Sequence, residues 1–198
     1  MFWVVIFWVV IVLSLVLWYS GLFSPIRVRV GGASASGPLT IHYKSGRSSY
    51  WTVGGLFKEM MALVPNDSYF IGLYYDDPNQ VCGAQCRWAV GVVTKADRHT
   101  LLTDNYIEQL TQWGYKRFEL PATVRAVIAT HPWTTAFSVY LAPMRVYRAI
   151  SSFVKRERLT AYPAVELYHD HQIEYCMPLE GQHAYYVPEA STTHTRTH

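Results

Sequence analysis

Residues 71–76 read IGLYYD and residues 165–170 read VELYHD, so one strand-like pattern occurs twice in the chain. Each copy follows a helix-like segment that ends near a proline, so each half reads strand, helix, strand, strand. Two such halves pair their sheets about a pseudo-twofold axis and leave a concave groove between the helices. The repeat is short and gives weak support alone, but it predicts an α+β fold.

The rest of the chain fills in the elements of these halves. Strands are predicted where apolar residues alternate or run together, and helices where they recur every three or four residues. The expected strands cover residues 39–44, 69–75, 86–94, 115–120, 124–130, 163–168 and 172–177. The expected helices cover residues 51–64, residues 103–113 with Gly114 as C-cap, and a segment around residues 146–153 that Pro143 starts or kinks.

An uncharged apolar run, FWVVIFWVVIVLSLVLWY, occupies residues 2–19. At about 1.5 Å per residue it reaches roughly 27 Å, close to the hydrocarbon thickness of a bilayer. Arg27 and Arg29 follow the run and nothing basic precedes it, which places the C-terminal part in the cytosol. A cleaved signal peptide fits poorly, because no positive n-region precedes the run. The Asn66 sequon would be glycosylated only in the lumen.

The predicted domain organisation has four parts. Residues 1–21 are the transmembrane anchor, residues 22–38 a linker, residues 39–188 one folded domain and residues 189–198 a disordered tail. The net charge of +3 is too small and scattered to indicate a nucleic-acid partner.

Three cysteines do not make a disulfide framework, and a reducing compartment explains them more simply. Cys82 and Cys86, with His131, His169 and His171, suggest a zinc site. Structural zinc needs four ligands, commonly with a tight C-x-x-C pair, and a second pair is missing here. The sequence therefore predicts no metal and no cofactor.

The ordered set of motifs resembles the GyrI-like domain of the testis-expressed protein 264 family. The motifs are YYDDP at 74–78, CRWAVG at 86–91, ATHPWTT at 129–135, KRERL at 155–159, AYP at 161–163, ELY at 166–168 and YVPE at 186–189. Together with the anchor they span nearly the whole chain. The resemblance implies a GyrI-like domain of two strand-helix-strand-strand repeats behind a transmembrane helix.

The resemblance also implies a function. Members are single-pass proteins of the endoplasmic reticulum membrane that face the cytosol, and vertebrate members are receptors for autophagy of that organelle. The expected role is a receptor or adaptor in reticulophagy, with autophagy modifier proteins or quality-control machinery as partners. In the family, a long acidic tail with an aromatic-x-x-aliphatic motif contacts the modifier. This chain ends at His198, and its aromatic-x-x-aliphatic spacing at residues 162–165 lies in an expected core strand.

Glu166 is the most informative candidate, because it replaces Gly72 of the other copy in an otherwise apolar and aromatic strand. In related GyrI-like ligand domains such a glutamate meets cationic compounds among aromatic rings. Tyr168, Tyr74 and Trp88 would add cation–π contacts to a small cationic or hydrophobic ligand. The alternative function is therefore a membrane-tethered small-molecule sensor. The structural alternative has Glu166 facing solvent or pairing with an arginine such as Arg125.

Enzymatic chemistry has little support in the sequence. It contains no serine nucleophile elbow, phosphate loop or dinucleotide fingerprint, and Glu166 has no identified catalytic partner. Some GyrI-like proteins resemble hydrolases that use such a glutamate with a tyrosine, so hydrolysis stays a minor alternative.

Basic residues on the third helix favour a solvated face over a lipid or acidic-partner surface: Arg145, Arg148, Lys155, Arg156 and Arg158.

Overall fold

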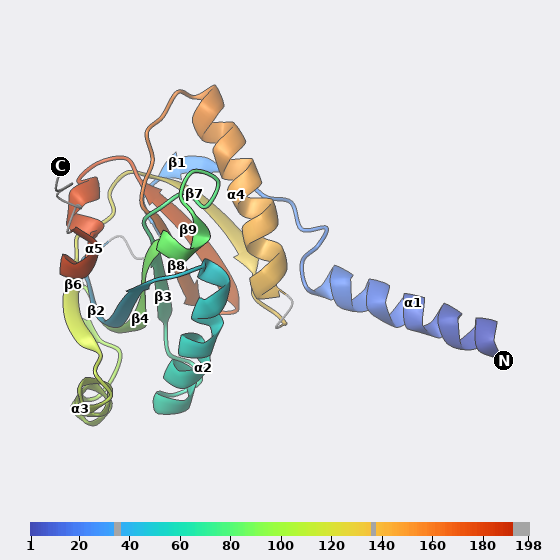
Figure 1. Cartoon of the computed structure of the whole chain (residues 1–198), viewed down its shortest axis with the longest axis horizontal. Coiled ribbons are helices and arrows are strands. Elements are labelled where there is room, and N and C mark those ends of the chain that lie inside the picture. Colours follow the sequence, from blue (N-terminus) through green and yellow to red (C-terminus); the bar gives the residue numbers. More distant parts are fainter. Residues whose placement is uncertain (34–36, 136–137, 192–198) are drawn as a thin grey trace.

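The computed structural model describes residues 1–33, 37–135 and 138–191. The first helix, α1 (Phe2–Tyr19), projects from a folded head that contains all the other elements (Figure 1). None of its residues is buried, and it is long and apolar enough to cross a membrane. The predicted anchor is thus a continuous helix that the head leaves uncovered.

The head is built on one antiparallel sheet, whose described strands run in the order β1-β7-β9-β8-β3-β4-β2-β6, with β5 paired to β4. The strands are β1 (Arg29–Gly31), β2 (Leu39–Arg47), β3 (Phe70–Tyr74), β4 (Arg87–Ala96), β5 (His99–Thr100), β6 (Lys116–Leu120), β7 (Ala126–Pro132), β8 (Ala164–His169) and β9 (Gln172–Pro178). The helices are α2 (Gly54–Leu63), α3 (Asp104–Gln112), α4 (Ser138–Arg156) and α5 (Pro188–Ser191). Single 3₁₀ turns occupy Tyr50–Val53, Gly83–Gln85 and Gln182–Tyr185.

The predicted duplication is confirmed by this topology. One half is β2-α2-β3-β4 and the other is β7-α4-β8-β9, and the sheet order is symmetric about the β3–β8 pair. The two copies of the repeat are the central strands, and their equivalent positions Gly72 and Glu166 pair with each other. The pseudo-twofold axis therefore passes through the pair that the sequence singled out.

Each face of the sheet has its own apolar core. The helices α2, α3 and α4 bury one face, with Met60, Leu110, Val146 and Ile150 almost fully enclosed. The C-terminal segment covers part of the other face through Tyr185, Val187 and Ala190. The side chains of each strand alternate between these two cores, because successive residues of a strand point to opposite faces.

Two predicted segment boundaries are wrong. The expected linker over residues 22–38 is largely part of the head, since Ile26 and Val28 pack on the core and β1 pairs with β7. The expected tail from residue 189 begins as α5, with Ala190 buried, whereas residues 192–198 lie outside the described residues. Neither feature could be predicted from local sequence, because each is short and is stabilised by residues far away in the chain.

The basic face of α4 also differs from the prediction at one position. Arg145 is half-buried and donates to the backbone oxygens of Gly21 and Ser24, at 2.6 and 2.9 Å. Arg148 and Lys155 are exposed, as expected of a solvated face. Pro143 lies inside α4 rather than in its first turn.

Candidate functional site

Glu166 lies at the centre of the head, on β8 between β3 and β9. Its side chain is 3% exposed and is directed to the same face as Tyr168, two residues further along the strand. That face is the one that α2 and α4 cover. A carboxyl group so far from water must find hydrogen-bond partners inside the protein.

Two tyrosines supply these partners. The hydroxyl of Tyr147, on α4, donates to Glu166 Oε1 at 2.7 Å, and the hydroxyl of Tyr168 donates to Oε2 in a short hydrogen bond. Both carboxylate oxygens are therefore occupied. The reading in which Glu166 faces solvent or pairs with Arg125 is wrong, since Arg125 instead pairs with Glu180 at 3.3 Å.

The environment makes the Glu166 carboxyl group a weaker acid than an ordinary glutamate. Burial raises the pKa of Glu166, and the hydrogen bonds from Tyr168 and Tyr147 lower it only in part, so the pKa stays above its ordinary value. Burial also raises the pKa of Tyr147 and of Tyr168 well above the usual range, so both phenols stay neutral. The site is thus a buried cluster of low polarity, in which two neutral tyrosine hydroxyls donate hydrogen bonds to one carboxyl group.

Aromatic rings from both halves of the chain enclose the carboxyl group. Tyr168 meets Phe57 of α2 and Trp133, with ring centroids 5.2 and 5.4 Å apart, and Tyr147 meets Tyr175 at 5.3 Å. These contacts fill the space between α2 and α4. The open groove expected there is closed by side chains in this structure.

The aromatic enclosure leaves one polar atom without a partner. The hydroxyl of Tyr175 is buried and has no hydrogen-bond partner among the described residues. Tyr175 pairs directly with Glu166 across the strands β8 and β9. An unsatisfied buried hydroxyl is costly, so this atom is the natural contact for a polar group entering the cluster.

Three of the four predicted ligand residues come together. Tyr74 follows Gly72 on the same face of β3, and a Cβ at Gly72 would lie 2.8 Å from the Tyr74 ring. Because Gly72 pairs with Glu166, the absent side chain lets this ring lie over the centre of the sheet. Burial, with the nearby Glu166 charge, raises the pKa of Tyr74.

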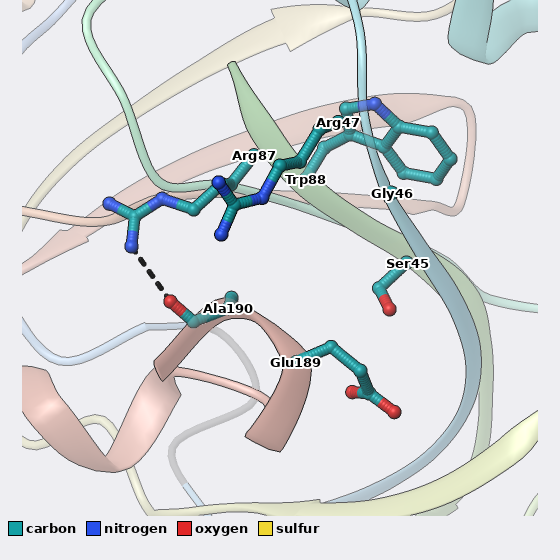
Figure 2. A pocket seen from close by; sticks show the side chains of 7 residues that line it. All are labelled: Ser45, Gly46, Arg47, Arg87, Trp88, Glu189 and Ala190. Carbon is teal, nitrogen blue, oxygen red and sulfur yellow. Dashed lines mark hydrogen bonds between the residues drawn. The ribbon is translucent and has the colours of Figure 1, made fainter. Parts of the chain in front are cut away.

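Trp88 lies on the same face of the sheet, directly opposite Tyr74 on β4, but its indole leans toward β2 and away from Glu166. Its Nε1 donates to Ser48 Oγ at 3.0 Å and its indole lies against Gly46, which places it over β2, on the far side of β4 from β8. It lines a separate cavity of about 210 Å³ between β2, β4 and α5, where Arg87 donates to the Ala190 carbonyl at 2.7 Å (Figure 2). Glu166 is not among the residues that line this cavity.

Sequence reasoning missed Tyr147 and Tyr175. Tyr175 was within reach, because residues 170 and 171 form a two-residue hairpin loop in which both φ angles are positive. That loop fixes the register of β8 and β9 and so places Tyr175 opposite Glu166. Tyr147 follows Val146, the first residue of the buried Val146–Ile150 stripe of α4. Its hydrogen bond to Glu166 depends on the orientation in which α4 packs on the sheet, which the sequence does not give.

The chemistry available to the described residues is limited. They contain no group of three or more His, Cys, Asp or Glu side chains that could hold a metal ion. The cysteines are free thiols, of which Cys82 is exposed while Cys86 and Cys176 are buried. The functional group that the site itself presents is the buried Glu166 carboxyl group with its two tyrosine donors.

Comparison with known proteins identifies relatives at the level of sequence. No protein-family model matches the chain. The testis-expressed protein 264 homolog of Mus musculus and testis-expressed protein 264 of Homo sapiens are each 35% identical to it over 175 residues, which is 88% of this chain. The chain spans about half the length of these curated relatives, 56% and 55% respectively.

Solved structures resemble the head more distantly. A hydrolase from Listeria innocua is 10% identical with a TM-score of 0.44, covering 80% of this chain and 94% of its own. A chain of the EcmrR–DNA complex is 12% identical with a TM-score of 0.48, covering 77% of this chain and 57% of its own. At this similarity neither structure bears on activity. The chain is thus homologous, over 88% of its length, to the testis-expressed protein 264 family that its motifs resemble.

Proposed function

We propose that this protein is a single-pass adaptor of the endoplasmic reticulum membrane that presents its head to the cytosol and takes part in reticulophagy. The observation that carries the proposal is the 35% identity to testis-expressed protein 264 over 88% of the chain. The uncovered apolar helix α1 supports the membrane span, and Arg27 and Arg29 behind it support the cytosolic side.

The topology can be tested with the natural sequon. Asn66 lies in an exposed loop after α2, so its accessibility does not limit glycosylation. We expect the chain expressed in cells to remain in alkali-washed membranes and to carry no glycan at Asn66. A fusion with a cleavable signal peptide in front of residue 22 is the control and must gain the glycan. A glycan on the natural chain would contradict the proposed orientation.

The adaptor role needs a separate test, made with the full gene product because the chain spans half of its relatives. The aromatic-x-x-aliphatic spacing at residues 162–165 is unsuited to binding, since Val165 is 7% exposed within β8. We expect the full gene product to co-precipitate with an autophagy modifier protein and to reach lysosomes on starvation. If the recognition motif lies outside the head, a variant with Tyr162→Ala and Val165→Ser should co-precipitate the modifier protein as well as the natural protein does. Failure to reach lysosomes would exclude the adaptor role.

A second candidate function is small-molecule sensing at Glu166. The buried carboxyl group, its ring of tyrosines and the unpartnered Tyr175 hydroxyl favour it. A ligand would have to displace the rings of Tyr147 or Phe57. We expect a lipophilic cation, tetraphenylphosphonium, to raise the melting temperature of the full chain and Glu166→Gln to abolish that rise. An equal rise in both proteins would remove Glu166 from the binding site.

We further propose that the head is not an enzyme. Glu166 is the only candidate acid or base that the sequence indicated, and both of its oxygens are held by tyrosine hydroxyls away from water. Hydrolysis of a p-nitrophenyl ester should be equal for the natural chain and Glu166→Gln. A rate that falls with this substitution would restore the hydrolase alternative.

A further inference from the structure

The anchor helix is joined to the head without a flexible connection. The α1 helix ends in a Schellman motif, in which Gly21 N donates to Trp18 O and Leu22 N donates to Leu17 O, both at 3.1 Å. Gly21 has the left-handed φ of +87° that this motif requires. The chain turns there and runs directly onto the surface of the head.

A set of hydrogen bonds, here called the collar, fixes this turn to the start of α4. Thr134 Oγ1 donates to Tyr19 O at 2.7 Å, and Ser138 Oγ donates to Ser20 O at 3.2 Å. The hydroxyls of Ser20 and Thr135 lie 2.6 Å apart, and Ser20 is fully buried. The collar satisfies carbonyl groups that the end of α1 would otherwise leave unpaired.

Large apolar side chains lie exposed beside the collar. Tyr140 and Met144 are one helical turn apart on α4 and are 57% and 69% exposed. Trp51 is 69% exposed and stacks on Tyr140 with ring centroids 6.3 Å apart, and Phe23 is 70% exposed just after the collar. We call these four residues the contact patch. Tryptophan and tyrosine are enriched where a protein meets the membrane–water interface.

The depth of the patch follows from helix geometry. Tyr140 and Met144 lie two and six residues beyond Ser138, so they are separated from it by at most about 3 and 9 Å along the membrane normal, and by less where α4 is tilted. The headgroup layer on each side of a bilayer is roughly 5–8 Å thick. In Figure 1 the C-terminal end of α1 faces the N-terminal end of α4, whereas α3 and α5 lie on the opposite side of the head. The first part of α4, which carries Tyr140 and Met144, therefore lies on the side of the head that faces α1 (Figure 1).

The charge pattern of α4 is compatible with that membrane. Arg148 lies one turn beyond Met144 on the same exposed line, and Lys155 follows toward the C-terminal end. The first part of α4 thus offers apolar side chains to the interface, whereas Arg148 and Lys155, about 15 and 26 Å beyond Ser138 along the helix, stay in solvent outside the headgroup layer.

We propose that the head rests on the bilayer that anchors it, with the contact patch inserted in the headgroup layer and the collar holding it there. This inference rests on the membrane span of the proposed function but not on its role in autophagy. It assigns a fixed orientation to the head. The occupant of the exposed patch is the phospholipid interface itself.

The test uses the full chain in nanodiscs of phosphatidylcholine that contain a headgroup nitroxide lipid. The exposed Cys82 is replaced by serine, and a bimane probe is placed at Met144→Cys or, as a control, at Asn105→Cys on α3. We expect at least twofold stronger quenching at position 144 than at position 105. Equal quenching in a chain that co-elutes with the nanodiscs would overturn the docked orientation alone, whereas failure to co-elute would overturn the membrane span.

Two further variants test the parts of the proposal in the Met144→Cys background. Thr134→Val with Ser138→Ala removes collar hydrogen bonds and should lower quenching toward the value at position 105. Trp51→Ser with Tyr140→Ser should lower it as well, whereas Trp113→Ser, at the C-cap of α3, removes an exposed tryptophan far from the patch and should not. Quenching unaffected by both double variants would contradict the proposed roles of collar and patch.

Discussion

At the scale of single residues, protonation of Glu166 makes the free energy of unfolding depend on pH. Its carboxyl group binds a proton more tightly in the folded chain than in the unfolded chain, because burial raises its pKa above 4.5. Its contribution to stability is complete below pH 4.5 and is lost as the pH rises through the folded pKa. We expect Glu166→Gln to remove this loss. The measurement is the free energy of unfolding in detergent micelles from pH 4 to 8.

Tyr147→Phe is the companion variant to Glu166→Gln. It removes the donor to Oε1 without changing the ring contact with Tyr175, and should cost about 1–3 kcal/mol because the acceptor is buried. It should also steepen the decline of stability with pH, since one bond that lowers the Glu166 pKa is gone. A decline no steeper than that of the natural chain would show that this bond does not set the pKa.

Gly91 of β4 is needed because the backbone of β2 passes close to it. A Cβ at Gly91 would lie 2.3 Å from the His42 carbonyl oxygen and 2.9 Å from the Tyr43 Cα, and backbone atoms cannot move aside cheaply. We expect Gly91→Ala to destabilise the chain by about 3 kcal/mol or more. Gly55→Ala is the matched control: nothing lies within 4 Å, and alanine within α2 should add roughly 0.5–1 kcal/mol of stability. Similar loss in both variants would contradict the close-approach argument.

At the scale of elements, one guanidinium group ties the C-terminal helix to the sheet. Arg87 donates from Nε and Nη2 to Asp76 at 2.9 and 2.7 Å, and from Nη1 to the Ala190 carbonyl (Figure 2). Burial would raise the pKa of Asp76, but the bonds from Arg87 outweigh it and hold the pKa below its ordinary value. Asp76 is thus held by Arg87, whereas the neighbouring Asp77 forms a turn in which it accepts from Asn79 N at 2.9 Å.

We expect Arg87→Met to release α5. Amide exchange over residues 182–191 should accelerate at least tenfold, because α5 loses a hydrogen bond to its carbonyl and is too short to be stable alone. Arg117→Met is the control, since that arginine is exposed and, within the part of the chain that the structure describes, forms its ion pair with Glu119 on its own strand. Exchange that accelerates equally in both variants, or in neither, would contradict the assigned role of Arg87.

The sequence predicted elements well where local periodicity decides them. The helices and central strands follow from spacing, and the two-residue loop at Asp170–His171 even determines a register. The sequence did not predict β1 and α5, which are three and four residues long. The first is stabilised by pairing with β7, and the second by a hydrogen bond from Arg87. The site was predicted in part, since strand alternation gives Tyr168 beside Glu166, but the partner on α4 depends on tertiary packing.

At the scale of the whole molecule, neither half is complete. The central hydrogen-bonded pair joins β3 of one half to β8 of the other, and the aromatic cluster takes Phe57 and Tyr74 from the first half but Tyr147 and Tyr168 from the second. A separated half would expose a long apolar strand edge and half of each core. We therefore expect the two halves to fold as one cooperative unit rather than as two domains.

Cutting the chain between Val124 and Arg125 tests this cooperativity, because both residues are exposed and lie between the halves. We expect residues 1–124 and 125–198 to be unfolded when expressed separately and to form one folded complex when co-expressed. The measurement is co-purification through a tag on one fragment, followed by a single thermal transition. Cys176 is 4% exposed in the intact head, so its protection from alkylation in the complex reports native packing. Either fragment alone giving a cooperative transition would mean that the halves are independent domains, and the shared Glu166 cluster would then be a docking contact between them.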